Sequence, residues 1–238
     1  MPRDPWRSLE PVHIVSTAAR LERRIRERFP EASLARLAGE LLEVAREATE
    51  RTTAMRRPNW WIRVVVAVLV GALLLVVGAA LGGLRGGPAV REWGPLAQTV
   101  ESTINDLVFV GIAVVFLLGL ERRLQRRREL RAIYELRSIA HIVDMHQLTK
   151  DPDRLREGLP DTASSPDRPL GPVELARYLD YCSEMLSLTG KIAAIYGEGI
   201  DDPVVLGAVQ QVEGLATGLS SKIWQKIMIL DAAAAPRV

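Results

Sequence analysis

The sequence predicts an all-α protein in which a two-span transmembrane helical hairpin carries a cytoplasmic helical bundle. Residues 64–84 form a run of 21 residues without a charge. Such a run makes about 31 Å of helix, which matches a hydrocarbon core of ~30 Å. A second uncharged run covers residues 107–120. Elsewhere the apolar residues recur at three and four positions, and no stretch alternates with the period of two that is typical of strands.

Two amphipathic helices are expected before the first span. Apolar residues in the segment 12–29 follow the three-and-four spacing of one helical face. Pro30 and Glu31 suit the opening turn of a second helix, which the same spacing extends to about Met55. We assign residues 1–58 to these N-terminal cytoplasmic helices.

The transmembrane hairpin is assigned to residues 59–120. Its spans are expected at about 62–84 and 104–120, joined by an outer loop at 85–103 in which a short surface helix can form near residues 96–104. The first span begins too far into the chain, behind a charged segment, to be a secretory signal. We therefore expect the chain to stay anchored.

The C-terminal half is assigned to the cytoplasmic helical bundle, residues 121–238. One continuous helix is expected from about Ser102 to Leu148, because no Gly or Pro follows the second span within it. Two amphipathic helices then follow, one from Pro172 to about Tyr196 and one opening at Asp202-Pro203.

Charge distribution sets the expected orientation. Arg outnumbers Lys 27 to 4, and the arginines cluster on the N-terminal side of the first span and the C-terminal side of the second. A bias of basic residues in short flanking segments marks the cytoplasmic side of a membrane. Both termini are therefore expected in the cytoplasm, with the hairpin in the membrane. The one cysteine, Cys182, permits no disulfide within the chain.

Aromatic and basic residues at the ends of the hairpin are expected to contact lipid headgroups. Indole rings favour the interface, and arginines below the membrane meet anionic headgroups. The basic run lacks the interleaved aromatics of a nucleic-acid site, so no nucleic-acid partner is expected. The headgroup-contacting residues are Trp60, Trp61, Arg122, Arg123, Arg126, Arg127 and Arg128.

Small residues in the first span offer a helix-packing face. Gly78 and Gly82 form a GxxxG pair, and Gly71 closes a second small-residue pair with Ala67. This face can pack against the second span of the same chain, or it can associate with a second copy.

The second span is short and opens with two polar residues. Asn105 and Asp106 precede only fourteen uncharged residues, or ~21 Å of helix. In a homo-oligomer these side chains would form a ring of oxygens at the outer mouth of a pore. Alternatively, Asp106 rests among headgroups or caps the start of its helix.

A polar stripe interrupts the apolar surface of the long helix. Arg137, His141 and Asp144 follow one another at i, i+4 and i+7. They can form a buried hydrogen-bonded network that fixes helix register. Alternatively, His141 and Asp144 can supply two metal ligands, completed by Tyr178, Cys182 or Glu184 of a neighbouring helix or subunit. A carboxylate beside a histidine also makes a pH sensor conceivable.

No catalytic motif is present. The chain has no GxSxG, HExxH or phosphate-binding glycine loop, and its lone cysteine has no evident histidine partner. We expect no enzymatic activity and no cofactor.

Three stretches, AHIVDMHQLTKDP, LDYCSEMLSLTGKIAAIYG and SSKIWQKIMIL, resemble a family of bacterial inner-membrane proteins to which no activity is assigned. The resemblance covers about the last hundred residues and implies the membrane setting alone. The leading hypothesis is a non-enzymatic membrane protein that self-associates, or scaffolds a protein partner, through its cytoplasmic helices. The alternatives are a homo-oligomeric ion channel or transport component with Asn105 and Asp106 at its mouth, and a metal- or pH-sensing regulator.

Overall fold

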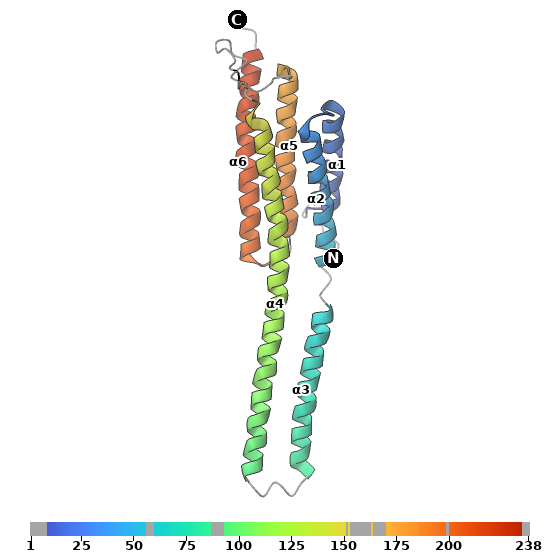
Figure 1. Cartoon of the computed structure of the whole chain (residues 1–238), viewed down its shortest axis with the longest axis vertical. Helices are drawn as coiled ribbons and strands as arrows, with labels where there is room; N and C mark the ends of the chain where they lie inside the picture. The colour runs from blue at the N-terminus through green and yellow to red at the C-terminus, as the bar shows by residue number, and fades with distance from the viewer. Residues whose placement is uncertain are drawn as a thin grey trace. The chain divides into compact units, whose positions relative to one another are not determined.

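A computed structural model describes residues 9–55, 60–86, 93–150, 152, 163, 170–198 and 200–234 of the 238-residue chain. These residues contain helices and no strand, which confirms the all-α prediction. The helices are α1 (Pro11–Arg28), α2 (Ser33–Met55), α3 (Trp60–Gly86), α4 (Trp93–Leu148), α5 (Pro172–Gly197) and α6 (Pro203–Ala234), as Figure 1 shows.

Local sequence explains the helix starts. Pro11 opens α1, and a proline in the first turn gives up no intrahelical hydrogen bond. The Asp202 carboxylate accepts hydrogen bonds from the backbone N–H of Val204 at 2.9 Å and of Val205 at 3.4 Å, so it caps α6 as expected. At α5 the side chain of Glu174 accepts a hydrogen bond from the backbone N–H of Gly171.

Two helices begin elsewhere than predicted. α2 starts at Ser33, because Pro30 and Glu31 belong to a tight turn after α1. In that turn the Ala32 N–H donates to the Phe29 carbonyl at 3.1 Å. α4 starts at Trp93, so no separate short helix precedes the long one. Pro95 lies in the first turn of α4, where its missing N–H costs nothing.

The chain divides into two compact units, residues 1–55 with 128–238 and residues 56–127. The first unit, which we call the bundle, contains α1, α2, α5, α6 and the C-terminal part of α4. The second contains α3 and the rest of α4. Among the residues described, no helix has both the length and the apolar character that crossing a membrane requires. The two-span hairpin therefore stays a prediction.

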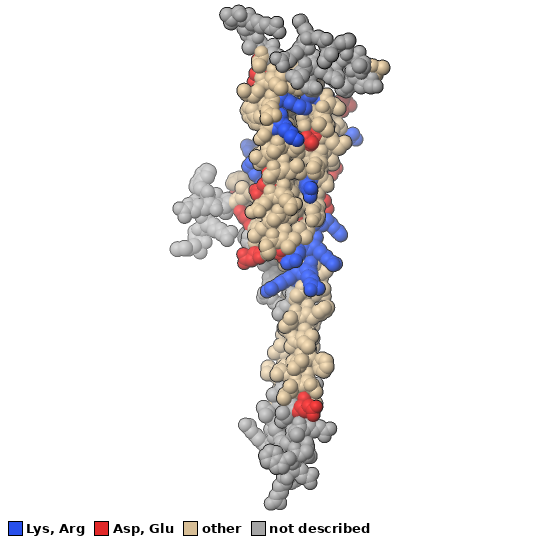
Figure 2. Space-filling model, turned by 90° about the vertical axis from the view of Figure 1, so that its left-hand side faces the viewer, with Lys and Arg blue, Asp and Glu red and all other residues tan. Residues whose placement is uncertain are grey.

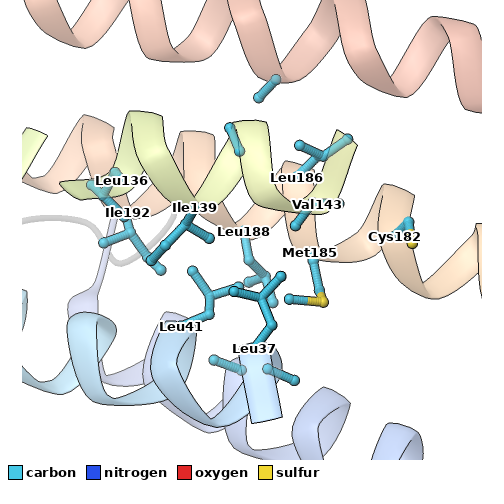
Figure 3. Close-up of a cluster of buried hydrophobic side chains, with 14 of the residues drawn as sticks. Leu37, Leu41, Leu136, Ile139, Val143, Cys182, Met185, Leu186, Leu188 and Ile192 are labelled. Atoms are coloured by element: carbon cyan, nitrogen blue, oxygen red, sulfur yellow. The ribbon is translucent and has the colours of Figure 1, made fainter. Parts of the chain in front are cut away.

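α5 is the central helix of the bundle. It packs against α6, α1 and α2, and α1 packs against α2 (Figure 1). Figure 3 shows Met185 and Ile192 of α5 among side chains of α2 and α4. The buried residues form one apolar cluster that draws on every helix of the bundle. Burial of this apolar surface is the main stabilising contribution to the bundle.

α4 enters this core through one face. Ala132, Ile133, Leu136, Ile139 and Val143 are buried and recur at the spacing of a helical stripe. The C-terminus of α4 is held by α6, because the Lys226 ammonium donates hydrogen bonds to the carbonyls of Gln147 at 2.8 Å and Lys150 at 3.3 Å. Gln147 lies in the last turn of α4, where a helix leaves carbonyls without an intrahelical partner, and Lys150 lies just after the helix.

Candidate functional site

A groove of about 700 Å³ opens on the bundle between α1, α5 and α6. Its floor is one face of α5, whose lining residues recur at three and four positions. We call it the α5 groove. The lining residues are Leu9, Glu10, His13, Ile14 and Thr17 of the α1 region, Asp180, Ser183, Glu184, Ser187, Leu188 and Lys191 of α5, and Trp224 of α6.

Trp224 lies toward the end of the groove where α5 begins. α5 and α6 run antiparallel, since a Cβ at Gly190 would lie 3.8 Å from Ala216 and one at Gly197 would lie 3.5 Å from Leu206. Extending this pairing places Trp224 level with the first half of α5. Its side chain is 57% exposed, so the groove presents a large indole face to solvent. Exposed indoles of this kind are common in protein contact surfaces.

Carboxylates outnumber cations in the groove. Glu10, Asp180 and Glu184 line it, against Lys191 and the titratable His13. The carboxylates are partly compensated, because Glu10 lies 3.3 Å from His13 and Asp180 lies 3.6 Å from Arg177. The groove combines apolar side chains and one indole with several polar groups, which is the usual composition of a protein contact surface.

One pair in the groove has the residue types of a Ser-Lys catalytic dyad. The Lys191 ammonium donates a hydrogen bond to Ser187 Oγ at 2.6 Å. A lysine acts as a general base only when its ammonium is desolvated, and Lys191 is exposed. The two residues are one helical turn apart, so we interpret the contact as an ordinary surface hydrogen bond.

Arg24 fixes the distance between α1 and α5 next to the groove. Its guanidinium donates two hydrogen bonds to the Glu184 carboxylate, at 2.8 and 3.1 Å. The guanidinium carbon also lies 5.2 Å from the centroid of the Tyr181 ring. The hydrogen bonds to Glu184 raise the pKa of Arg24 above its ordinary value. The two hydrogen bonds and the contact with the aromatic ring connect α1 to α5 beside the groove.

Aromatic packing supports the same junction. Phe29 directly follows α1. Its ring makes edge-to-face contacts with the rings of Tyr178 and Tyr181, with 5.5 and 6.2 Å between the ring centroids. The Lys150 ammonium lies over the ring of Tyr178, 5.5 Å from its centroid. Desolvation raises the pKa of Tyr178 above its ordinary range. Tyr178 is therefore a packing residue of the bundle.

The predicted polar stripe of α4 is not buried. Arg137 and His141 are exposed, and Asp144 is half-buried. Asp144 accepts a hydrogen bond from Gln147 at 2.6 Å. The prediction of a buried network that fixes register is therefore wrong. The helix is apolar on nearly every side, and packing selects the face of Leu136 and Val143, which leaves the stripe outside.

The second histidine of this segment faces the bundle instead. His146 is half-buried, and its Nδ1 lies 3.4 Å from the Ser33 hydroxyl of α2. Burial lowers the pKa of His146, and the nearby Lys150 ammonium lowers it further.

The structure does not assemble the suggested metal ligands. Within the described ranges, no group of three or more His, Cys, Asp or Glu side chains has a metal-binding arrangement. Cys182 is fully buried, and desolvation raises the pKa of its thiol to about 12. Glu184 is engaged by Arg24, and His141 faces solvent.

The candidate pore and packing residues lie in the unit of residues 56–127. Asn105 is exposed, whereas the side chain of Asp106 lies outside the described residues. No described atom comes within 4 Å of a Cβ placed on Gly71 or Gly78. Gly82 also lies outside the residues described at side-chain level.

The predicted headgroup-contacting residues are exposed where they are described. The Trp60 side chain is 72% exposed, and that of Trp61 lies outside the description. Arg122, Arg123, Arg126, Arg127 and Arg128 are all exposed on α4. Figure 2 shows Lys and Arg side chains gathered beside a stretch of uncharged surface.

Sequence reasoning did not identify the α5 groove. A usable signal was present, because polar residues recur along α5 at 180, 183, 184, 187 and 191, opposite its apolar stripe. The contributions of α1 and Trp224 depend on tertiary packing and had no local signal. Comparison with known proteins adds no further assignment, because no family model, curated protein or solved structure matches the chain.

Proposed function

We propose that this chain is a non-enzymatic protein of the bacterial inner membrane. In this proposal α3 and the N-terminal part of α4 form the hairpin anchor. The bundle is held at the cytoplasmic face, where it self-associates or scaffolds a protein partner. The observation that carries the proposal is the apolar surface that α3 and α4 leave exposed.

Large apolar side chains in the unit of residues 56–127 point away from any core. Leu75 is 76% exposed, Phe109 71% and Val115 71%. Other exposed members are Val64, Val65, Val68, Val70, Leu74, Leu107, Val108, Ile112 and Phe116. Apolar surface in water costs about 25 cal/mol per Å², and soluble monomers rarely expose patches beyond a few hundred Å². Lipid tails would remove this cost, which supports a hydrocarbon environment for both helices.

The sequence around the exposed apolar surface supports the orientation. Residues 64–84 and 107–120 carry no charge, and arginines follow directly from Arg122. Basic residues that flank short spans favour the cytoplasmic side. The bundle and both termini would then share that side.

The bundle is the part that we assign to protein contacts. The α5 groove offers an exposed indole, hydroxyls and paired charges on α1 and α5, which Arg24 connects. In the other unit, a hollow of about 700 Å³ along α4, lined by Gly111, Val115, Phe116 and Gly119, offers a face for self-association.

Membrane extraction tests the anchor. We expect the full chain to stay in the membrane pellet after alkaline carbonate treatment and to dissolve only with detergent. Tags at both ends should be digested by protease in inverted vesicles and protected in intact spheroplasts. Recovery of the untreated chain in the soluble fraction, or tags on opposite sides of the membrane, would refute the anchor.

Site-specific cross-linking tests the groove. A photoreactive residue in place of the exposed Ser187 should give one discrete adduct in cells, whose mass and peptides show whether it holds a second copy or another protein. The same residue at the exposed Arg36 of α2 is the matched control. Equal labelling at both positions would argue against the groove as a contact surface.

A further inference from the structure

Several arginines of the bundle have carboxylate partners. Arg24 pairs with Glu184, Arg46 with Glu43 at 2.5 Å and Arg51 with Glu47 at 2.5 Å; Arg26 pairs with Glu22 in the same way. Close pairing of this kind lowers the electrostatic free energy of neighbouring charges.

Four arginines lie close together just after the second uncharged run. Arg122, Arg123 and Arg127 are exposed, and none has an ion pair or hydrogen bond with another residue that the structure describes. Arg126 is exposed beside them and has an interaction partner of its own. We call these four residues the arginine collar. Several like charges so close together repel one another unless an anion lies between them.

Helix geometry arranges the collar in two columns. Arg122 and Arg126 are one turn apart, as are Arg123 and Arg127, so each pair stands on one side of α4. The Cα–Cβ bonds of a helix tilt toward its N-terminus, and the collar side chains therefore tend to extend toward the uncharged run 107–120. Two guanidinium forks at this separation can clasp one phosphate, and two adjacent columns can hold two phosphates.

We propose that the arginine collar binds the phosphodiester groups of an anionic phospholipid that carries two phosphates in one molecule, a diphosphatidyl lipid. This inference rests on the proposed membrane anchor, which brings the collar to the depth of the cytoplasmic headgroups. Arg123 and Arg127 bind one phosphate, and Arg122 binds the other. Joining the two phosphates in one lipid makes the second contact intramolecular, so this lipid is favoured over two separate single-phosphate lipids. Nucleic acid is the less suitable polyanion, since no aromatic residue interleaves with the arginines.

Lipid titration of the detergent-solubilised full chain tests the collar. Native mass spectrometry would measure binding of diphosphatidylglycerol and of phosphatidylglycerol to the wild type and to the double variant Arg123→Gln/Arg127→Gln. The control is Arg23→Gln/Arg28→Gln, which removes two exposed arginines from α1. We expect the wild type to bind diphosphatidylglycerol about tenfold more tightly than phosphatidylglycerol. The collar variant should lose about tenfold or more in affinity, and the control should keep the wild-type value.

Three outcomes would overturn the inference: equal affinity of the wild type for both lipids, equal losses in the two double variants, or displacement of the lipid by single-stranded RNA at matched phosphate concentration. The carbonate and protease experiments report on the anchor separately. An inserted chain without this lipid preference would remove the collar site and leave the proposed function intact. A chain that does not insert would remove both.

Discussion

Arg24 is the residue whose contacts most directly connect two helices of the α5 groove. It joins α1 to α5 through Glu184 and also lies over Tyr181. Because the pair is partly exposed, solvent screens it, and exposed pairs contribute about 0.2–1 kcal/mol. The ring contact adds about 0.5–1 kcal/mol.

We therefore expect Arg24→Ala to lower the free energy of unfolding by about 1 kcal/mol. Arg24→Lys should recover only part of this, since an ammonium cannot form the fork. Urea unfolding of Arg24→Ala, Glu184→Ala and the double variant gives the coupling energy. Strict additivity of the two single changes would show that the contact contributes nothing to stability.

His146 should make the stability of the bundle depend on pH. Its ordinary pKa is 6.5, and burial lowers the value in the folded chain. Below that pH the unfolded chain binds a proton that the folded chain resists. Stability is therefore highest above pH 6.5 and falls as the pH decreases toward the folded pKa.

The measurement compares urea midpoints of the wild type and His146→Gln between about pH 7.5 and 5.5. The wild type should lose more stability than the variant over this range. His141→Gln, at a histidine that faces solvent, is the matched control. If the urea midpoints of the wild type and of His146→Gln changed equally with pH, this would contradict the assignment.

The two histidines of α4 show what the sequence could and could not predict at this scale. Helical spacing correctly separates His141 and His146 onto different faces. It does not say which face is inside, because Ile142 and Met145 are as apolar as Ile139 and Val143. Packing against α2 and α5 decides which face is inside. It buries Ile139 and Val143 and leaves Ile142 and Met145 exposed.

At the scale of elements, proline and capping residues predicted the starts of α5 and α6 but not those of α2 and α4. Pro172 and Asp202-Pro203 open α5 and α6 where expected. The error at the start of α4 has a physical cause. A proline such as Pro95 commonly interrupts a helix, but in the first turn of a helix it loses no hydrogen bond. Sequence alone could not decide whether residues 96–104 were separate or part of the same helix.

The end of α4 gives a prediction at this scale. Lys226 binds the carbonyl of Gln147 in the last turn of α4 and that of Lys150 just after it, so Lys226→Met removes a charged donor from a helix C-terminus. We expect a loss of about 1–2 kcal/mol in the free energy of unfolding and faster amide exchange in the last turn of α4. Lys222→Met, one turn away and exposed, is the control. Equal losses in the two variants would mean that the carbonyl contacts are not stabilising.

For the whole molecule, the division into two units predicts that the bundle can fold alone. Residues 1–55 and 128–238 form one unit with a shared core. We expect a chain in which a flexible Gly/Ser linker replaces residues 56–127 to be water-soluble and helical by circular dichroism. Its urea unfolding should be a single cooperative transition. Aggregation or a broad, non-cooperative transition would show that the bundle needs the rest of the chain.

At this scale the sequence predicted which segments are helical and that the N- and C-terminal helices share one bundle. It did not predict the α5 groove. The groove depends on how α1 and α6 flank α5, and pairings between helices distant in sequence leave no periodic trace. The uncharged apolar runs and the arginine clusters could be identified because local composition alone defines them.

The burial of Cys182 has a practical consequence for spectroscopy. A thiol that is inaccessible and resists ionisation reacts slowly with maleimides while the protein is folded. A cysteine introduced at any exposed position would then be labelled selectively, with the native residue left unchanged. Pairs of such labels, one in each unit, would allow resonance energy transfer or electron spin measurements to determine how the two units are arranged.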